Sequence, residues 1–172
     1  SVNIPPAMLG SGHILPMVEE LRLTPYVNRI VCEVTERQAL TPVGRSALEN
    51  ARRSGMSVAI DDFGTGHSGL MQIVGLDFDI LKIYHSLIDR ILINQTAARM
   101  LRGIVALAAA LRLHTVAEGV ESREEAFFLR AAGVDWGQGW FWSKAVSGGR
   151  AARLLDQGYR AAGGSSYKRK RH

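Results

Sequence analysis

Short β-rich runs alternate with helical segments along the whole chain, and this alternation limits the possible folds more than any other feature of the sequence. Hydrophobic periodicity and turn residues predict strands at 1–4, 29–34, 57–63, 78–84, 114–118 and 134–140. They predict helices at 13–23, 44–54, 68–74, 96–113, 121–132 and 149–157. Strict alternation of this kind implies right-handed crossovers and a parallel sheet. The sequence therefore predicts an α/β fold, either a closed barrel or an open doubly wound sheet.

Polar residues interrupt the predicted strands at one end. A parallel strand that is buried on both faces is normally apolar throughout, so polar residues within it are informative. An open sheet gathers its ligand groups at one switch point, whereas a barrel arranges them in a ring around its mouth. Because every strand contributes, the pattern favours a barrel. The polar residues near the carboxyl ends of the six strands are Asn3, Glu33, Asp61, Asp62, Lys82, Glu118 and Gln138.

The composition is that of one soluble globular domain, since 47% of the 172 residues are hydrophobic and 22% are charged. These values exclude intrinsic disorder. The formal net charge is +5, but Lys168, Arg169, Lys170 and Arg171 supply four of these charges and leave +1 for the rest. The basic character thus belongs to the end of the chain and predicts no surface for double-stranded nucleic acid. We expect one barrel domain over residues 1–160 and a flexible basic tail over 161–172.

Cysteine usage and hydropathy predict the compartment. Cys32 is the only cysteine, so the chain forms no internal disulfide or multi-thiolate metal site and needs no oxidising environment. The longest apolar stretch, 104–111, is far shorter than the ~20 residues that span a bilayer. The first residues also lack the basic and apolar regions of a signal peptide. We therefore expect a cytoplasmic location and no membrane span in this chain.

The carboxylates at the predicted barrel mouth indicate a metal site. Glu33, Asp61, Asp62 and Glu118, together with the amide of Asn3, would repel one another strongly unless a divalent cation lay among them. A set of oxygen donors without His or Cys favours Mg²⁺ or Mn²⁺ over Zn²⁺. Two adjacent aspartates at a strand end suit a pair of metal ions, which is an arrangement that serves phosphodiester hydrolysis.

Lys82 is a second candidate for chemistry. The chain has 17 arginines and only four lysines, and this lysine lies inside an apolar strand. A cation at that position could hold the attacking water or a phosphate oxygen. The alternative is a structural ion pair with a carboxylate at the barrel mouth.

Several motifs resemble those of the EAL-domain phosphodiesterases, which hydrolyse the bacterial second messenger cyclic di-GMP. The resemblance implies a TIM-type (β/α) barrel of which this chain carries the last six of eight strands, preceded in the family by a strand with the glutamate of the EAL motif. It therefore also implies that the sequence is incomplete at its N-terminus. The matching strings, in family order, are SVN at 1–3, EVTE at 33–36, DDFGTG at 61–66, LKI at 81–83, VAEGVE at 116–121 and QG at 138–139.

The resemblance also implies a role for each matching residue in the metal-dependent opening of cyclic di-GMP to linear pGpG. Two ions are expected, and Glu118 is a candidate for the base as well as a ligand. Lys82 is expected to orient the water or a phosphate oxygen. Glu36 is expected to steady the loop 63–68, while Glu121 and Gln138 support metal, water or substrate. The expected metal ligands are Asn3, Glu33 and Asp61 for the first ion and Asp61, Asp62 and Glu118 for the second.

Two positions depart from the family pattern. Tyr84 stands where the family usually has aspartate, and the sequence WSKA at 142–145 replaces the usual FGRP. Tyr84 and the absence of the upstream glutamate leave open a second function, that of a catalytically degenerate domain which binds cyclic di-GMP or a protein partner and transmits a signal. A third reading is a barrel remnant whose missing strands come from another chain or are lost. A homodimer and an upstream sensory or regulatory domain in the full protein are further expectations.

Three tryptophans alternate near the last predicted strand, at 136, 140 and 142. Stacking on a guanine base is one interpretation. Packing of the strand against its helices is the other.

Overall fold

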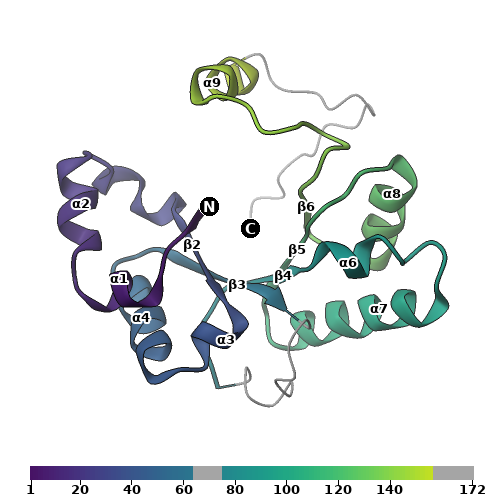
Figure 1. The fold of residues 1–172 in the computed structure, drawn as a ribbon, viewed down its shortest axis with the longest axis horizontal. Coiled ribbons are helices and arrows are strands. Elements are labelled where there is room, and N and C mark those ends of the chain that lie inside the picture. Colours follow the sequence, from purple (N-terminus) through teal and green to yellow (C-terminus); the bar gives the residue numbers. More distant parts are fainter. Residues whose placement is uncertain (64–74, 157–172) are drawn as a thin grey trace.

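Six parallel strands form a single sheet in the order of the sequence (Figure 1). The computed structural model describes residues 1–63 and 75–156. A sheet in which each strand pairs with the next along the chain is the order of a (β/α) barrel, so the fold is α/β with six strands of a TIM-type barrel. The strands are β1 Val2–Asn3, β2 Val31–Thr35, β3 Ser57–Phe63, β4 Ile80–Ile83, β5 His114–Ala117 and β6 Trp136–Gly137.

The helices cover the two halves of the sheet (Figure 1). Helices α1 and α4 lie near β2 and β3, and helices α7 and α8 lie near β4 and β5. The last helix, α9, lies apart from the others. Within the described residues no helix is long and apolar enough to cross a membrane. The helices are α1 Pro6–Gly10, α2 Ile14–Glu20, the 3-10 helix η1 Thr24–Arg29, α3 Glu36–Ala39, α4 Pro42–Arg53, α6 His85–Ile88, α7 Gln95–Ala110, α8 Arg123–Ala132 and α9 Gly148–Asp156.

All six predicted strands are present, although the last shortens from 134–140 to two residues. The predicted helix 13–23 is wrong in extent, because α2 ends at Glu20 and Arg22 adopts a left-handed conformation with φ 56° before η1 begins at Thr24. The short helices α1, α3 and α6 have no counterpart among the predictions, since a single turn carries little periodicity. The predicted helix 68–74 and the basic tail 161–172 lie outside the described residues.

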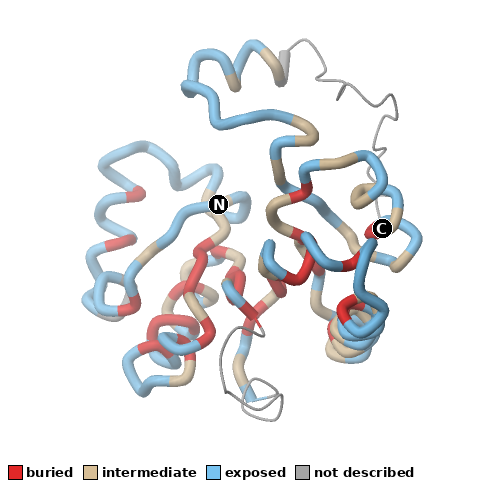
Figure 2. The backbone as a smooth tube through the Cα atoms, turned by 45° about the vertical axis from the view of Figure 1, so that its right-hand side comes forward, coloured by how far each residue is buried: buried red, intermediate tan, exposed pale blue. Residues whose placement is uncertain are grey.

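Alternation along the strands separates the apolar core from the charged site. On β2, Cys32 and Val34 pack with the helices, while Glu33 between them faces the opposite side. On β4, Leu81 packs in the core cluster beside β2 and Ile83 in the cluster beneath α7, whereas Lys82 faces away from both. Buried residues follow the strands and the helix faces that cover them (Figure 2). The period of two in a strand thus directs one set of side chains to the core and the other to the barrel interior.

Two aspartates brace the amino ends of the strands in the same way. Asp79 precedes β4, and its Oδ2 accepts a hydrogen bond of 2.9 Å from the amide of Val58 on β3. Asp135 precedes β6, and its Oδ2 accepts 2.8 Å and 2.9 Å hydrogen bonds from the amide and hydroxyl of Thr115 on β5. Arg52 on α4 also pairs with Asp79 and so ties the helix to this end of the sheet. These contacts lie at the opposite end of the strands from the charged site and act on stability.

Candidate functional site

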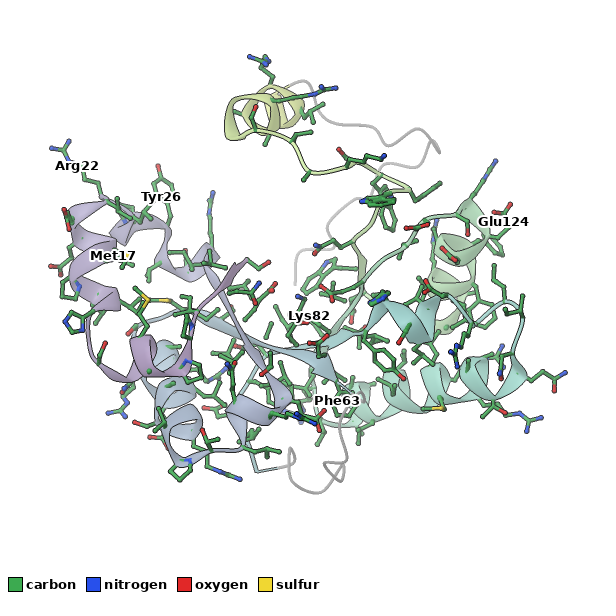
Figure 3. All side chains as sticks on the ribbon, in the orientation of Figure 1. Met17, Arg22, Tyr26, Phe63, Lys82 and Glu124 are labelled. Atoms are coloured by element: carbon green, nitrogen blue, oxygen red, sulfur yellow. The ribbon has the colours of Figure 1, made fainter. Side chains whose placement is uncertain are left out.

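Lys82, which is labelled near the middle of the sheet in Figure 3, contacts three carboxylates at the carboxyl end of the strands. Its Nζ lies 2.8 Å from Glu33 Oε2, 3.1 Å from Asp61 Oδ2 and 2.7 Å from Glu118 Oε1. The side chains of Lys82 and Glu33 are almost entirely buried, at 6% and 7% exposure. Residues from β2, β3 and β4 and the end of β5 therefore converge on one ammonium group, and we call these four residues the charged cluster.

The strand registers explain why these residues meet. β2 aligns Thr35 with Asp61 of β3, and Glu33 lies on the same face of β2 as Thr35. The amide of Glu118 donates a 3.1 Å hydrogen bond to the carbonyl of Ile83, so the β4–β5 ladder continues one residue past β5. Parallel strands that end at one edge present these side chains to the same interior space.

A bulge in β3 separates the two aspartates. Ile60 pairs with Leu81 and Phe63 with Ile83, so β3 uses three steps where β4 uses two. Asp62 takes up the extra residue in a left-handed conformation with φ 57°. Asp61 keeps its place in the charged cluster, and its Oδ1 accepts a 2.9 Å hydrogen bond from the Asp62 amide. The Asp62 side chain is exposed beside it.

The charged groups of the cluster shift one another's pKa values. Burial alone would lower the pKa of Lys82, but hydrogen bonds to the three carboxylates outweigh it and raise the pKa. Burial alone would raise the pKa of Glu33, but hydrogen bonds from Lys82 and Ser1 outweigh burial and lower it. Burial raises the pKa of Glu118 in spite of its hydrogen bond from Lys82. Glu118 therefore has a greater affinity for a proton than Glu33.

Asn3 lies on the strand that pairs with β2, and Glu36 begins the helix that follows β2. The β1–β2 register pairs Asn3 with Glu33, which places the amide at the same level of the sheet. Glu36 is buried at the first position of α3, directly after β2. The loop that Glu36 was expected to steady begins at Phe63, and its residues from 64 onward lie outside the described part of the chain.

One loop connects the charged cluster to a neighbouring pocket. Gly119 follows Glu118 with φ 71°, a conformation that side chains rarely adopt, and turns the chain so that Glu121 lines the pocket. Gly139 packs so closely on this loop that a Cβ there would lie 2.1 Å from the Val120 carbonyl oxygen. The Val120 amide donates a 3.0 Å hydrogen bond to the Gln138 carbonyl and fixes the contact.

The pocket has a volume of about 880 Å³ and contains both Glu121 and Gln138. The sequence predicts no role for His85 or Asp89, which also line the pocket. Their separation of four residues, just after the strand that carries Lys82, was the available signal, because residues four apart lie on one face of a helical turn. The charged cluster is not part of the pocket's lining, so the structure divides the predicted site residues between two adjacent places.

Tyr84, which stands where the family usually has aspartate, lies in apolar surroundings. It is half-buried at the start of α6 and packs against the apolar cluster that includes Leu87 and Ile88. The ring thus contributes to the core beside β4.

The chemistry of the charged cluster fits a hard divalent cation. Three carboxylate oxygens lie about one hydrogen-bond length from a single point, which is the Nζ of Lys82. Oxygen donors of this kind are the ligands that Mg²⁺ and Mn²⁺ prefer. Among the described residues no group of three or more His, Cys, Asp or Glu side chains is placed to hold a metal ion. The Lys82 ammonium occupies the point where the three carboxylate oxygens converge.

The sheet order and the charged cluster together define a TIM-type barrel domain with a site at its mouth. The sequence model of the EAL domain matches residues 1–145, so this chain belongs to the EAL domain family. Among similar proteins, the probable cyclic di-GMP phosphodiesterase PdeB of Escherichia coli (strain K12) is 35% identical over 149 residues. The match covers 85% of this chain and 28% of PdeB, so the chain spans less than a third of that relative.

Two solved structures show the same fold. The EAL enzyme Bd1971, in a form bound to cAMP and cyclic-di-GMP, superposes with a TM-score of 0.79 at 33% identity, over 89% of this chain and 42% of that one. BlrP1 of Klebsiella pneumoniae, in a manganese and cyclic di-GMP complex, superposes with a TM-score of 0.73 at 31% identity, over 83% and 38%.

Proposed function

We propose that this chain carries the site of a metal-dependent phosphodiesterase that hydrolyses cyclic di-GMP to linear pGpG. The observation that carries the proposal is the convergence of Glu33, Asp61 and Glu118 on Lys82 at the carboxyl ends of the strands. Barrel enzymes place their chemistry at this end. The similarity to PdeB and the manganese and cyclic di-GMP complex of BlrP1 support the choice of substrate and of a divalent metal.

We propose a role for each residue of the site. Mg²⁺ or Mn²⁺, as two ions, would activate water and neutralise charge on the phosphate. Lys82 would supply a positive charge to the water or to a phosphate oxygen. Glu118, whose pKa burial raises, would accept the proton of the attacking water. Glu36, Glu121 and Gln138 would support the loop and the substrate. Asn3, Glu33 and Asp61 would hold the first ion, and Asp61, Asp62 and Glu118 the second.

A second function is supported by the state of the charged cluster. Its carboxylate oxygens contact the Lys82 ammonium, and among the described residues no group of acidic, His or Cys side chains is placed to hold a metal ion. Tyr84 adds no negative charge, because a phenol is neutral at pH 7. A domain that binds cyclic di-GMP and transmits a signal without hydrolysis is therefore the alternative proposal.

Chromatography of cyclic di-GMP incubated with the purified chain separates the two functions. We expect pGpG in the presence of Mn²⁺ and none with a chelator. Asp61→Asn removes a charge from the cluster and should abolish the product, whereas Asp77→Asn changes an exposed carboxylate at the opposite end of the strands and should not. Folded chain that forms no pGpG but binds cyclic di-GMP in calorimetry would replace hydrolysis by the receptor function.

Further sequence in the relatives supports the first of two proposals about the whole protein. PdeB is much longer than the segment that this chain matches. We propose that the full protein carries an upstream sensory or regulatory domain and acts as a homodimer. Light scattering of the full protein tests the second point, since a monomeric mass at all concentrations would contradict it.

A further inference from the structure

One wall of the 880 Å³ pocket is formed by an aromatic ring and a cation. Trp140 is 63% exposed and lines the pocket together with Lys144. The Nζ of Lys144 lies 4.9 Å from the centroid of the Trp140 ring. A large aromatic side chain that stays exposed inside a pocket offers its face to a ligand.

The structure gives the three tryptophans different surroundings. Trp136 lies at the amino end of β6, with its ring 4.7 Å from that of His114. Trp142 packs edge-on against Phe141 at 5.1 Å and fills the space beside Gly137. Of the three, only Trp140 lines the pocket. The packing interpretation of the sequence therefore describes Trp142, and the stacking interpretation remains available to Trp140.

We infer that Trp140 and Lys144 hold the nucleotide of the substrate that is not being cleaved, with its base on the indole and its phosphate on the ammonium. This inference rests on the proposed function. A cyclic dinucleotide has two halves, so a half whose phosphodiester lies at the charged cluster leaves the other to a neighbouring site. The loop from Glu118 to Glu121 joins the cluster to this pocket. The volume is within the range of small-ligand pockets, roughly 300–1,000 Å³.

The contact between the Lys144 ammonium and the Trp140 ring is one that a bound nucleotide can replace. An exposed cation–π contact is weak, so a purine base can displace the ammonium from the ring. The displaced ammonium remains on the same wall and meets the phosphate of that nucleotide. Lys144 and Trp140 are thus positioning residues that act on affinity, while the charged cluster acts on the chemistry.

GMP is the probe for this site, because it carries one purine base and one phosphate. In the presence of chelator, a GMP titration should shift the indole N–H signal of Trp140 in the NMR spectrum, identified by its loss in Trp140→Phe. We expect Trp140→Leu to weaken GMP binding about tenfold, as loss of a stacked base does. Trp136→Leu, at the other end of the strand, is the matched control and should leave the affinity unchanged.

The salt dependence of GMP binding tests Lys144. Wild-type affinity should fall with rising salt, and Lys144→Gln should bind about threefold more weakly with a shallower slope, because one phosphate contact is lost. Arg150→Gln on the exposed side of α9 is the control. An unchanged slope in Lys144→Gln, a shift of only the other indoles, or equal binding of inorganic phosphate would overturn the inference.

Kinetics separate this inference from the proposed function. If the chain forms pGpG, Trp140→Leu should raise KM about tenfold with kcat unchanged. A fall in kcat at constant KM would contradict a positioning role. If the chain forms no pGpG, GMP binding still tests the pocket, so failure of the enzyme and failure of the pocket are distinguishable.

Discussion

Lys82 Nζ lies 2.7 Å from Glu118 Oε1, and this ion pair joins the middle of β4 to the residue that follows β5. The same ammonium contacts carboxylates from β2 and β3. One cation thus offsets part of the negative charge of three acids from β2, β3 and the end of β5, and of these acids Glu33 is buried while Asp61 and Glu118 are partly buried. Lys82 therefore reduces the repulsion among these carboxylates at the barrel mouth.

Removal of this cation should destabilise the metal-free chain. We expect Lys82→Met to lower the free energy of unfolding by about 3 kcal/mol, because it leaves the buried Glu33 and the partly buried Asp61 and Glu118 without their shared cation. Added Mn²⁺ should then raise the melting temperature of Lys82→Met more than that of the wild type, since the metal replaces the lost charge. Thermal denaturation with and without Mn²⁺ measures both effects. Lys144→Met, a variant of a lysine outside the cluster, is the control, and equal stability of all three proteins would refute the expectation.

The stability of the fold should depend on pH through Glu33. Its folded pKa lies below the ordinary value of 4.5, so below neutrality the unfolded chain binds more protons than the folded one. The stabilisation from Glu33 is therefore present above pH 4.5 and is lost as the pH falls through the folded pKa. Urea unfolding at a series of pH values should show a shallower acid loss for Glu33→Gln than for the wild type. Parallel acid limbs would mean that Glu33 is not the responsible group.

Gly139 should tolerate no side chain. A Cβ at this position would lie 2.1 Å from the Val120 carbonyl oxygen, so Gly139→Ala must displace the loop that carries Glu118 and Glu121. We expect a loss of several kcal/mol of stability, at the upper end of single substitutions. Gly103→Ala on α7 has no atom within 4 Å of its Cβ and should stabilise the chain by about 0.5–1 kcal/mol, because alanine favours helix. Equal melting temperatures for the two variants would contradict the close approach.

The aspartate braces at the amino ends of the strands should affect stability and not the site. We expect Asp135→Ala to cost about 1–3 kcal/mol, because the Thr115 amide and hydroxyl lose their acceptor. Asp77→Ala removes only an exposed ion pair with Arg52 and should cost less than about 1 kcal/mol. Chemical denaturation gives the two values, and Mn²⁺ affinity measured by calorimetry should be the same in both variants. A change in metal affinity for Asp135→Ala would show coupling between the two ends of the barrel.

Several features of the molecule were predictable from local sequence. The period of two along 31–35 and 80–83 places Glu33 and Lys82 on the face opposite the core residues Cys32 and Leu81. Alternating strands and helices predict parallel pairing, and hence that all strands end at one edge. The family motifs add an expectation for each site residue. Patterns of this kind depend on residues close together in the chain, so the sequence is sufficient to define them.

Only the tertiary structure decided which of these residues touch. Glu33 and Lys82 are 49 residues apart, and their 2.8 Å contact depends on strand register and the curvature of the sheet. The structure also shows two backbone features that the sequence pattern does not predict. Asp62 adopts a left-handed conformation in the bulge of β3, and Arg22 adopts one where the predicted helix 13–23 is broken. The division of the tryptophans into a packed Trp142 and an exposed Trp140 depends on which neighbours surround each ring. Such contacts join distant segments, and their energy belongs to the assembled sheet because no short stretch of sequence contains both partners.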